Sequence, residues 1–487
     1  MPEAAKKKAF SWISENEHRI TETSDKIWEF AEIGYQEVKS ASLLSEELRK
    51  AGFKVEIGVA GIPTAFVATW GEGKPVIGVM GEYDALTGLS QKKLPRKEPI
   101  IEGAPGHGCG HNLHGTSGMA GVIAAKVAME AARIQGTLKF FGCPAEEGGS
   151  GKVFMVREGI FDGLDAVLSH HPSTMNTASL ASSLANNYVR FHFYGTSSHA
   201  AGSPEQGRSA LDAVELMSIG LNFLREHVIQ EARIHYSITG DRFTPEVVPP
   251  YAYMTCLIRA PEREQLDEIY ERILDIARGA ALMTGTMHKV QLMKAIHNKI
   301  PNRTLSDIVI KNMREIGAPK YTKEELEYAK EVSKTIAPEE KKASLRKSKR
   351  PGWEKLMDVI LDQSIPDPWD DGEVGRGSTD VADVSWNTPT IEFPTTAFVL
   401  GTPGHSWMNV ALSGMGIGHK SVIFAAKTIS ASIIDLLMKP ELLKKAHEEL
   451  ERRLAGKVYK SPVPPEVKPP LDYLAGRDLR VDKTSVL

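Results

Sequence analysis

Residues 106–134, GHGCGHNLHGTSGMAGVIAAKVAMEAARI, join a glycine-rich loop with three histidines and one cysteine to a run of small and apolar residues. The small side chains from Gly115 to Ile134 predict a helix that packs closely on a sheet. The loop before it is too polar and too flexible for a hydrophobic core. We therefore expect this loop to hold ligands at the edge of a sheet.

Strand-like segments lie on both sides of this helix, and a further helix is expected from Trp28 to Lys50, before Gly52. The strand-like segments are PTAFVATW at 63–70, KPVIGVMGEYDAL at 74–86, GTLKFFGCPAEEG at 136–148 and LDAVLSHHP at 164–172. Strands that alternate with helices predict an α/β fold with a mixed or parallel sheet. In such sheets ligands collect beyond the strand ends, where the clusters GEYD, GHGCGHNLHG, PAEEGG and SHHP lie.

The segment 187–299 has a different pattern, with strands and helices in the order βαββαβ. This order is typical of a ferredoxin-like unit and predicts a second domain inserted into the first. The catalytic domain is then expected to comprise 1–186 and 300–456, followed by an extended, proline-rich tail at 457–487. The stretch 320–355 is dense in Lys and Glu and is expected to be an exposed helix or a mobile excursion.

The bulk composition excludes several classes of protein. The 487 residues are 41% hydrophobic and 25% charged with a net charge of -3, without the basic excess of a nucleic-acid-binding surface. Three widely spaced cysteines argue against a disulfide framework and favour the reducing cytoplasm. Charges interrupt the first residues before a signal-peptide core can form, and no membrane anchor is expected.

Side chains that bind metals recur at the predicted strand ends. Cys109 and His111 are two residues apart, so in an extended loop both can face one ion. Thiolate, imidazole and carboxylate form the ligand set of zinc, manganese, cobalt or iron. Each motif alone is weak evidence, because a single buried Cys or His is more often a core residue and an acidic pair often lies on a surface helix. The remaining candidates are Glu146, Glu147, His171 and His405.

Taken together, these motifs resemble the M20 family of metallopeptidases and amidohydrolases, in the amidohydrolase branch with a CGH motif. The matching pieces, in family order, are GEYDALTGLSQ, PGHGCGHNLHG, PAEEGGSGK, HHPS, GTSSHAAGSPEQGRSALDA, GSTDVADVSW and TPGHS. The resemblance implies a mixed-sheet, two-metal hydrolase domain whose inserted domain serves as a lid and for dimerisation. It implies two divalent ions, zinc or manganese with cobalt as a further option, bound by Cys109, His111, Glu147, His171 and His405.

The resemblance also implies roles for residues outside the metal ligands. Glu146 would be the general base. His199 would reach into the active site of a second copy of the chain and stabilise the oxyanion, which implies a homodimer. Arg259 and Arg208 are candidates to bind a substrate carboxylate, although surface pairing is an equal alternative for both. Thr379 is a further candidate for substrate contact.

Several residues near these motifs have no settled role. Ser378, Asp380 and Asp383 could support the metal ligands or cap a helix. The segment GEYDAL departs from the family's His-x-Asp or Arg-Ala-Asp pattern, which makes a metal role for Glu82 unsafe and leaves Asp84 as a supporting residue. No family role can be transferred to His107, His114 or His170.

The resemblance implies metal-dependent hydrolysis of the amide bond of an N-acyl or N-aroyl amino acid, such as p-aminobenzoyl-glutamate. A dipeptidase for unusual dipeptides is an alternative, because the same machinery cleaves that bond. A non-catalytic binding partner is a second alternative, disfavoured by the complete ligand set with Glu146. A related A-type subunit is a further candidate partner, whereas nucleic acid and membranes are not expected.

Overall fold

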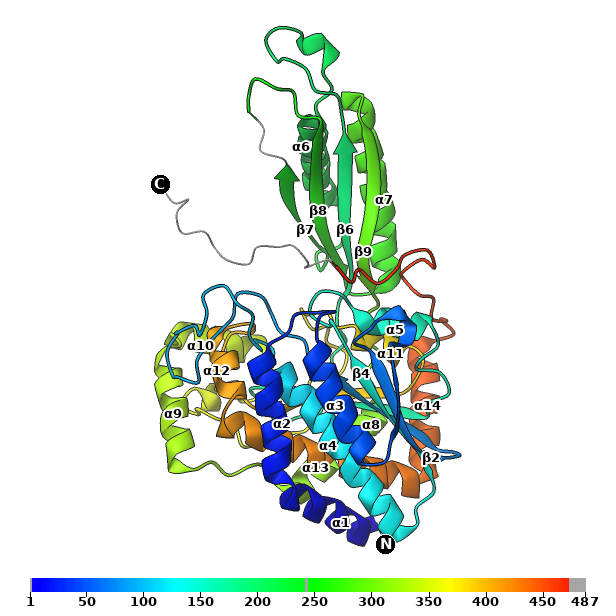
Figure 1. Ribbon diagram of the computed structural model, residues 1–487, viewed down its shortest axis with the longest axis vertical. Coiled ribbons are helices and arrows are strands. Elements are labelled where there is room, and N and C mark those ends of the chain that lie inside the picture. Colours follow the sequence, from blue (N-terminus) through cyan, green and yellow to red (C-terminus); the bar gives the residue numbers. More distant parts are fainter. Residues whose placement is uncertain (1, 241–243, 473–487) are drawn as a thin grey trace.

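Two sheets organise the computed structural model, which describes residues 2–240 and 244–472. The strands of the six-stranded sheet are β1 Lys54–Ile57, β2 Phe66–Glu72, β3 Val76–Glu82, β4 Gly136–Cys143, β5 Ala166–Ser173 and β10 Thr390–Thr396. The strands of the four-stranded sheet are β6 Ala185–Tyr194, β7 Arg233–Gly240, β8 Tyr251–Ala260 and β9 Met287–Ile296. The smaller sheet stands above the larger body (Figure 1).

Helices pack on both sheets. The small domain, defined here as β6–β9 with their two helices, contains α6 Ala210–Leu224 and α7 Arg263–Thr284. The helices of the larger domain are α1 Pro2–Glu15, α2 Glu17–Phe30, α3 Val38–Lys50, α4 His111–Ala132, α5 Gly151–Arg157, α8 Arg303–Ile316, α9 Lys323–Lys334, α10 Pro338–Lys347, α11 Val381–Ser385, α12 Trp407–Ser413, α13 Gly416–Met438 and α14 Pro440–Leu454.

The larger sheet has the strand order β1-β2-β4-β3-β5-β10. Strands β4, β3, β5 and β10 run parallel, whereas β2 is antiparallel to β4 and β1 is antiparallel to β2. The predicted mixed α/β sheet is therefore confirmed. Because the four neighbouring strands β4, β3, β5 and β10 are parallel, their carboxyl ends lie at one edge, and the loops that follow them meet there.

Helix α4 crosses this sheet at close range because its first turns carry glycine. A Cβ atom at Gly115 would lie 2.6 Å from the Glu82 carbonyl oxygen, and one at Gly118 would lie 2.9 Å from that of Met80. Real side chains cannot approach a backbone so closely. The small residues after the histidine-rich loop thus bring the start of α4 against the end of β3.

The two faces of the sheet are covered differently. Helices α3, α4, α8 and α13 build the main core on one face, while α5 and α11 pack on the other. Helix α13 is long and apolar enough to cross a membrane, but 83% of its most apolar window is buried inside the protein. It packs along α4, as a core helix does.

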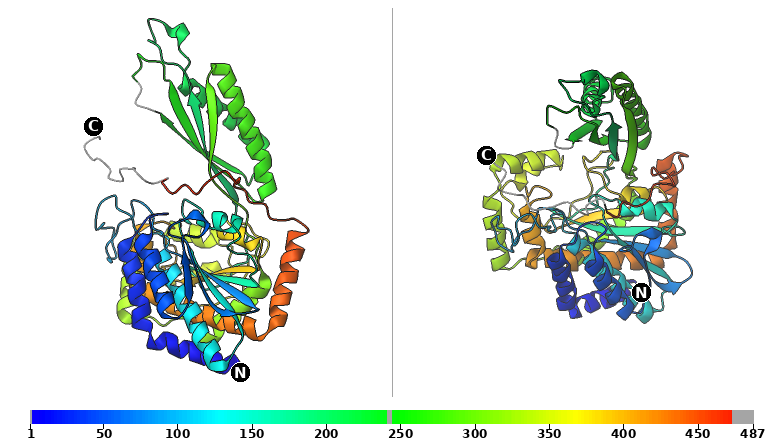
Figure 2. Two further views of the ribbon diagram at one scale, coloured as in Figure 1. Left: turned by 45° about the vertical axis from the view of Figure 1, so that its right-hand side comes forward. Right: turned by 45° about the horizontal axis from the view of Figure 1, so that its top comes forward.

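The small domain has the sheet order β7-β8-β6-β9, with neighbouring strands antiparallel. Together with the element order βαββαβ, this is the expected ferredoxin-like arrangement. Its own apolar core lies between one face of the sheet and helices α6 and α7. Both views of Figure 2 show these helices on one side of the sheet. The exact domain boundaries proposed from the sequence stay a prediction.

The helix expected from Trp28 to Lys50 is wrong as a single element. The structure has two helices, α2 and α3, separated by residues 31–37. Ala31 and Tyr35 adopt left-handed backbone conformations, and the Glu32 carboxylate accepts hydrogen bonds from the first backbone N–H groups of α3. These local contacts stop the helix, although the apolar spacing continues across the break.

The other two sequence expectations concern the charged stretch and the tail. Residues 320–355 form α9 and α10, whose surfaces are largely exposed apart from a few residues such as Ala329 and Leu345. The tail contains no helix between 457 and 472, and residues 473–487 lie outside the described part. It does not hang free, because Val463 is buried in the core beside α5 and α11.

Candidate metal centre

The five predicted metal ligands come together where the parallel strands end. Donor atoms of Cys109, His111 and His171 all lie within 4.8 Å of one another. Those of Cys109, Glu147 and His405 form a second group of the same size. Cys109 belongs to both groups, so its sulfur lies between two positions that could each hold a cation. Side chains distant in sequence thus build one continuous cluster.

The distances inside the cluster are short enough for its donor atoms to share a cation. The Cys109 Sγ atom lies 3.4 Å from Nε2 of His171, and Nε2 of His405 lies 3.4 Å from a Glu147 oxygen. His111 Nε2 and Glu147 Oε1 are buried and form no hydrogen bond with the described residues, although a Glu82 oxygen lies 3.3 Å from His111 Nε2. Buried polar atoms without partners are costly, and metal coordination would satisfy both. The donor set therefore fits two transition-metal ions.

Asp84 holds two of these ligands in place. One of its oxygens lies 2.7 Å from Nδ1 of His111, and the other accepts a hydrogen bond from the Glu147 backbone N–H at 3.0 Å. Because Nδ1 of His111 donates a hydrogen bond to Asp84, Nε2 carries the lone pair that can bind a metal ion. Burial alone would raise the pKa of Asp84, but the neighbouring His111 imidazole lowers it. The ionised Asp84 side chain therefore orients His111 and Glu147 without being one of the predicted metal ligands itself.

Residues at or near the predicted metal ligands adopt left-handed backbone conformations. His405 has a φ of 55°, and Ala145 and Ser150, which flank the acidic pair, have φ values of 57° and 54°. Residues with side chains rarely adopt the left-handed conformation, and such conformations cluster at functional sites. His405 is also the most open of the five residues, with 55% of its side chain exposed.

Glu146 lines the cavity next to these ligands. Burial, together with the negative charges of Glu82 and Glu147, raises the pKa of Glu146 well above that of an ordinary glutamate. A carboxyl group with a raised pKa is suited to accept a proton and return it near neutral pH. Its surroundings are thus compatible with the predicted role as general base.

A buried charge network lies behind Glu146, and its central residue was not recognised in the sequence. The Lys152 ammonium is fully buried and lies 2.6 Å from Glu82 and 2.6 Å from Asp380. Glu82 itself faces Nε2 of His111 at 3.3 Å. Lys152 follows the acidic pair in GGSGK, but a single lysine in a glycine-rich loop carries no signal of burial.

The extra histidines serve structural contacts around this centre. His107 Nε2 lies 2.9 Å from the Ile27 carbonyl oxygen. His114 accepts a hydrogen bond from the Glu82 backbone N–H, and His170 lies between the hydroxyls of Ser117 and Thr395. His114 also forms a candidate metal-binding group with Glu82 and Glu392, an arrangement that the sequence did not suggest.

A cavity of about 520 Å³ opens in front of the cluster. Ser378 and Thr379 line it from the larger domain, and Arg259 lines it from the base of the small domain. Asn186 and Lys294 also line it, although neither was recognised in the sequence. The cavity therefore lies between the two sheets, with the candidate ligands Cys109, Glu147, His171 and His405 in its wall.

His199 and Arg208 do not line this cavity of their own chain. Both lie beyond Tyr194, at the far end of β6, a strand that rises roughly 30 Å at about 3.3 Å per residue. Arg208 donates to the carbonyl oxygens of Glu205 and Gly207. The roles predicted for His199 and Arg208 stay predictions, and they require a second copy of the chain.

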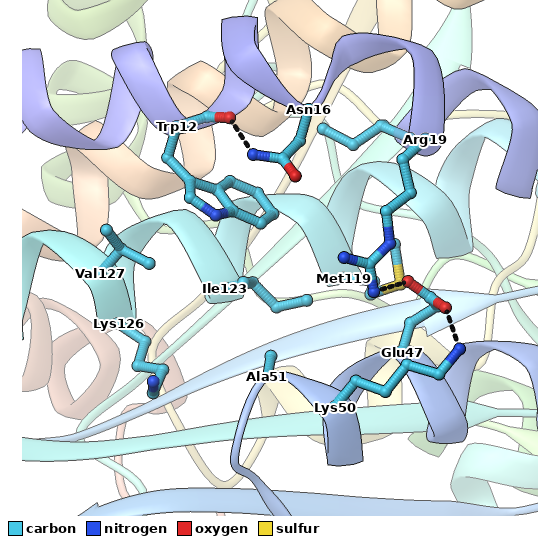
Figure 3. A pocket seen from close by; sticks show the side chains of 11 residues that line it. Trp12, Asn16, Arg19, Glu47, Lys50, Ala51, Met119, Ile123, Lys126 and Val127 are labelled. Carbon is cyan, nitrogen blue, oxygen red and sulfur yellow. Dashed lines mark hydrogen bonds and ion pairs between the residues drawn. The ribbon is translucent and has the colours of Figure 1, made fainter.

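A separate cavity of about 230 Å³ lies between α1, α2, α3 and α4 (Figure 3). Its charged residues already pair with one another: Arg19 and Lys50 both contact Glu47. Apolar side chains such as Met119 and Ile123 form its floor. None of the candidate metal ligands lines it, so this cavity is not part of the site.

Comparison with known proteins places these observations in a family context. Residues 78–411 match the family described as peptidase family M20/M25/M40. The B-type subunit of p-aminobenzoyl-glutamate hydrolase from Escherichia coli (strain K12) is 41% identical over 466 residues, covering 94% of this chain and 97% of that protein. The Xaa-Arg dipeptidase of Mus musculus is 28% identical over 468 residues, covering 93% of each chain.

Solved structures show the same fold. The aminobenzoyl-glutamate utilization protein from Klebsiella pneumoniae has a TM-score of 0.62 at 17% identity, covering 87% of this chain and 97% of that one. The YXEP protein of Bacillus subtilis is described as a dinuclear metal binding peptidase from the M20 family. It has a TM-score of 0.52 at 16% identity, covering 85% of this chain and 98% of that one. At these identities the likeness establishes the fold alone.

Proposed function

This chain belongs to peptidase family M20/M25/M40, and from that membership and the converging ligand set we propose that it hydrolyses the amide bond of N-acyl or N-aroyl amino acids. Substrates of the p-aminobenzoyl-glutamate type are the best supported, since the relative at 41% identity carries that name and matches nearly the whole chain. The single observation that carries the proposal is the cluster of five donor side chains around Cys109, facing a cavity.

Two divalent ions, zinc or manganese, would be held by Cys109, His111, Glu147, His171 and His405. When bound, they would polarise the scissile carbonyl and lower the pKa of a water molecule to about 7. Asp84 orients His111 and the Glu147 backbone through its two carboxylate oxygens. Glu146 accepts the proton of the attacking water and returns it to the leaving amide nitrogen. Thr379 and Arg259, which both line the cavity, contact the substrate.

His199 completes the site of a second copy in this proposal. Its Nδ1 atom accepts hydrogen bonds from the backbone N–H groups of Ala201 and Gly202, so a neutral ring carries its proton on Nε2. That N–H is free to stabilise the oxyanion in the cavity of the second copy. Exposed apolar side chains support pairing through the small domain. They are Ile219, Phe223, Leu282, Met283 and Met287.

A related protein is a further partner in the proposal. The relative at 41% identity is named as the B-type subunit of its hydrolase, and the A-type subunit named for the same activity in Escherichia coli (strain K12) is also similar to this chain. The dipeptidase alternative draws support from the Xaa-Arg dipeptidase at 28% identity. The two basic side chains that line the cavity from the small domain, Arg259 and Lys294, favour an acidic substrate over one that ends in arginine.

The test is amino-acid release from p-aminobenzoyl-glutamate, other N-acyl amino acids and dipeptides by the metal-loaded protein and its Glu146→Gln variant. We expect release from N-acyl amino acids by the unaltered protein and a fall of roughly 10²- to 10⁴-fold in the variant, with unchanged metal content. Equal rates in both proteins would remove Glu146 from the mechanism. No release from any substrate would favour the non-catalytic binding partner.

A further inference from the structure

Three side chains of the small domain point into the cavity from one face of its sheet: Asn186, Arg259 and Lys294. Strand β6 lies between β8 and β9, with Asn186 opposite Arg259 and Tyr188 opposite Lys294. Alternate residues of a strand share a face, so all three project away from the apolar core on the other side. The base of the small domain thus presents two cations and one amide to the substrate space.

Neither cation has a counter-ion among the described residues. Arg259 donates one hydrogen bond, 3.3 Å long, to the Arg376 carbonyl oxygen, and its Nε atom has no partner. Lys294 forms no hydrogen bond or ion pair with the described residues. Lys299, in contrast, lines the same cavity and lies 3.5 Å from the Glu392 carboxylate. A half-buried ammonium without a partner is costly, and an anionic ligand would offset that cost.

Two of the three carboxylates whose charges act on Lys294 already have other partners. Asp380 forms an ion pair with Lys152, and Glu147 belongs to the candidate metal ligands. Burial lowers the pKa of Lys294, while the charges of Glu146, Asp380 and Glu147 oppose that effect without contact. None of the three forms a hydrogen bond or an ion pair with Lys294 among the described residues, so the hydrogen-bonding capacity of the ammonium is unused.

We propose that Lys294 is a specificity residue that binds the side-chain carboxylate of an acidic amino acid, while Arg259 binds the α-carboxylate. The inference rests on the proposed hydrolysis of N-acyl amino acids and narrows it to N-acylated dicarboxylic amino acids. Every amino acid offers an α-carboxylate, for which the planar fork of one arginine suffices. Lys294, the second cation, is explained if the substrate carries a second anionic group in its side chain. Lys294 also repels substrates whose side chain is cationic, such as those that contain lysine or arginine.

The test compares p-aminobenzoyl-glutamate with p-aminobenzoyl-glutamine, which has the same shape without the charge. In the unaltered protein we expect the glutamate compound to have the higher kcat/KM. Lys294→Met should reduce that preference by roughly 10- to 100-fold, the loss expected for one charged hydrogen bond. Lys289→Met, at an exposed position of the same strand, is the matched control and should leave the preference unchanged.

A binding measurement separates this inference from the proposed function. Calorimetric titration of free glutamate and glutamine into the unaltered protein and Lys294→Met needs no turnover. We expect the unaltered protein to bind glutamate more tightly than glutamine, whether or not any amide is hydrolysed. Lys294→Met should not show this preference. An equal preference in both proteins would overturn the role of Lys294, even if hydrolysis is observed. Absence of hydrolysis with the expected binding pattern would overturn only the proposed reaction.

Discussion

The Oδ1 atom of Asp84 lies 2.7 Å from Nδ1 of His111, and both side chains are fully buried. This pair fixes which nitrogen of His111 faces the other candidate metal ligands. Replacing Asp84 by Asn keeps the shape but removes the charge that orients and polarises the imidazole. We expect Asp84→Asn to weaken metal binding by roughly 10- to 100-fold.

Competition with a chelator of known affinity measures this loss. Asp25→Asn is a suitable control, because Asp25 pairs with Lys93 at a partly exposed position away from the cluster. If Asp84→Asn bound metal as tightly as the control, Asp84 would have no part in holding the ligands.

The buried ammonium of Lys152 should be essential for stability. Lys152→Met would leave Glu82 and Asp380 buried without their common cation. Removal of one partner from a buried ion pair costs about 3–5 kcal/mol. Chemical denaturation should show this loss, and adding Asp380→Asn to the variant should restore part of it. Loss of less than about 1 kcal/mol in Lys152→Met would contradict a stabilising role of this network.

A second buried contact should make stability depend on pH. Asp383 accepts hydrogen bonds from the Tyr459 hydroxyl of the tail and from the His297 backbone N–H, both at about 3 Å. Burial raises the pKa of Asp383 to about 7. The folded protein then holds this proton more tightly than the unfolded chain, so its contribution to stability is complete below about pH 4 and is lost as the pH rises to about 7.

The corresponding measurement is the free energy of unfolding between pH 4 and 8. The slope from Asp383 should approach about 1.4 kcal/mol per pH unit within the window. Asp383→Asn should remove this component, so that the difference between the two proteins changes with pH. Parallel profiles would show that Asp383 is ionised in the folded state.

Two inactive variants should restore each other if His199 acts across a dimer. Glu146→Gln removes the proposed base, and His199→Ala removes the proposed oxyanion donor, each with metal content intact. A mixed dimer contains one cavity with both native residues, so activity should reappear when the two proteins are unfolded and refolded together. Near-normal turnover of His199→Ala alone, or no recovery in the mixture, would exclude this role.

Much of the fold followed from local patterns. The alternation of strands and helices predicted the mixed sheet, and the βαββαβ order predicted the ferredoxin-like unit, because both depend on periodicity within short segments. The break between Phe30 and Val38 was missed because it depends on the local contacts of Glu32 with the start of α3 and on an isolated bridge between Ile33 and Ala85. Apolar spacing alone cannot reveal such a contact.

The candidate site was predictable to the extent that its residues belong to motifs. Cys109, His111, Glu147, His171 and His405 each lie in a glycine- or proline-rich segment with a recognisable pattern. Lys152 and Lys294 have no such pattern, because the role of Lys152 depends on its burial in α5 and that of Lys294 on which side of β9 it occupies. A lysine in a sequence is most often an exposed residue, so only the three-dimensional arrangement reveals these two.

The most direct test of the two-metal account is the metal content of the protein after stripping and reloading, measured by elemental analysis for the unaltered chain and for Cys109→Ala. Because Cys109 belongs to both donor groups, we expect about two ions per chain in the unaltered protein and fewer than one in the variant. Cys256→Ala, altered in the core of the small domain, should still bind two. Two ions retained by Cys109→Ala, or none bound by the unaltered protein, would contradict the account.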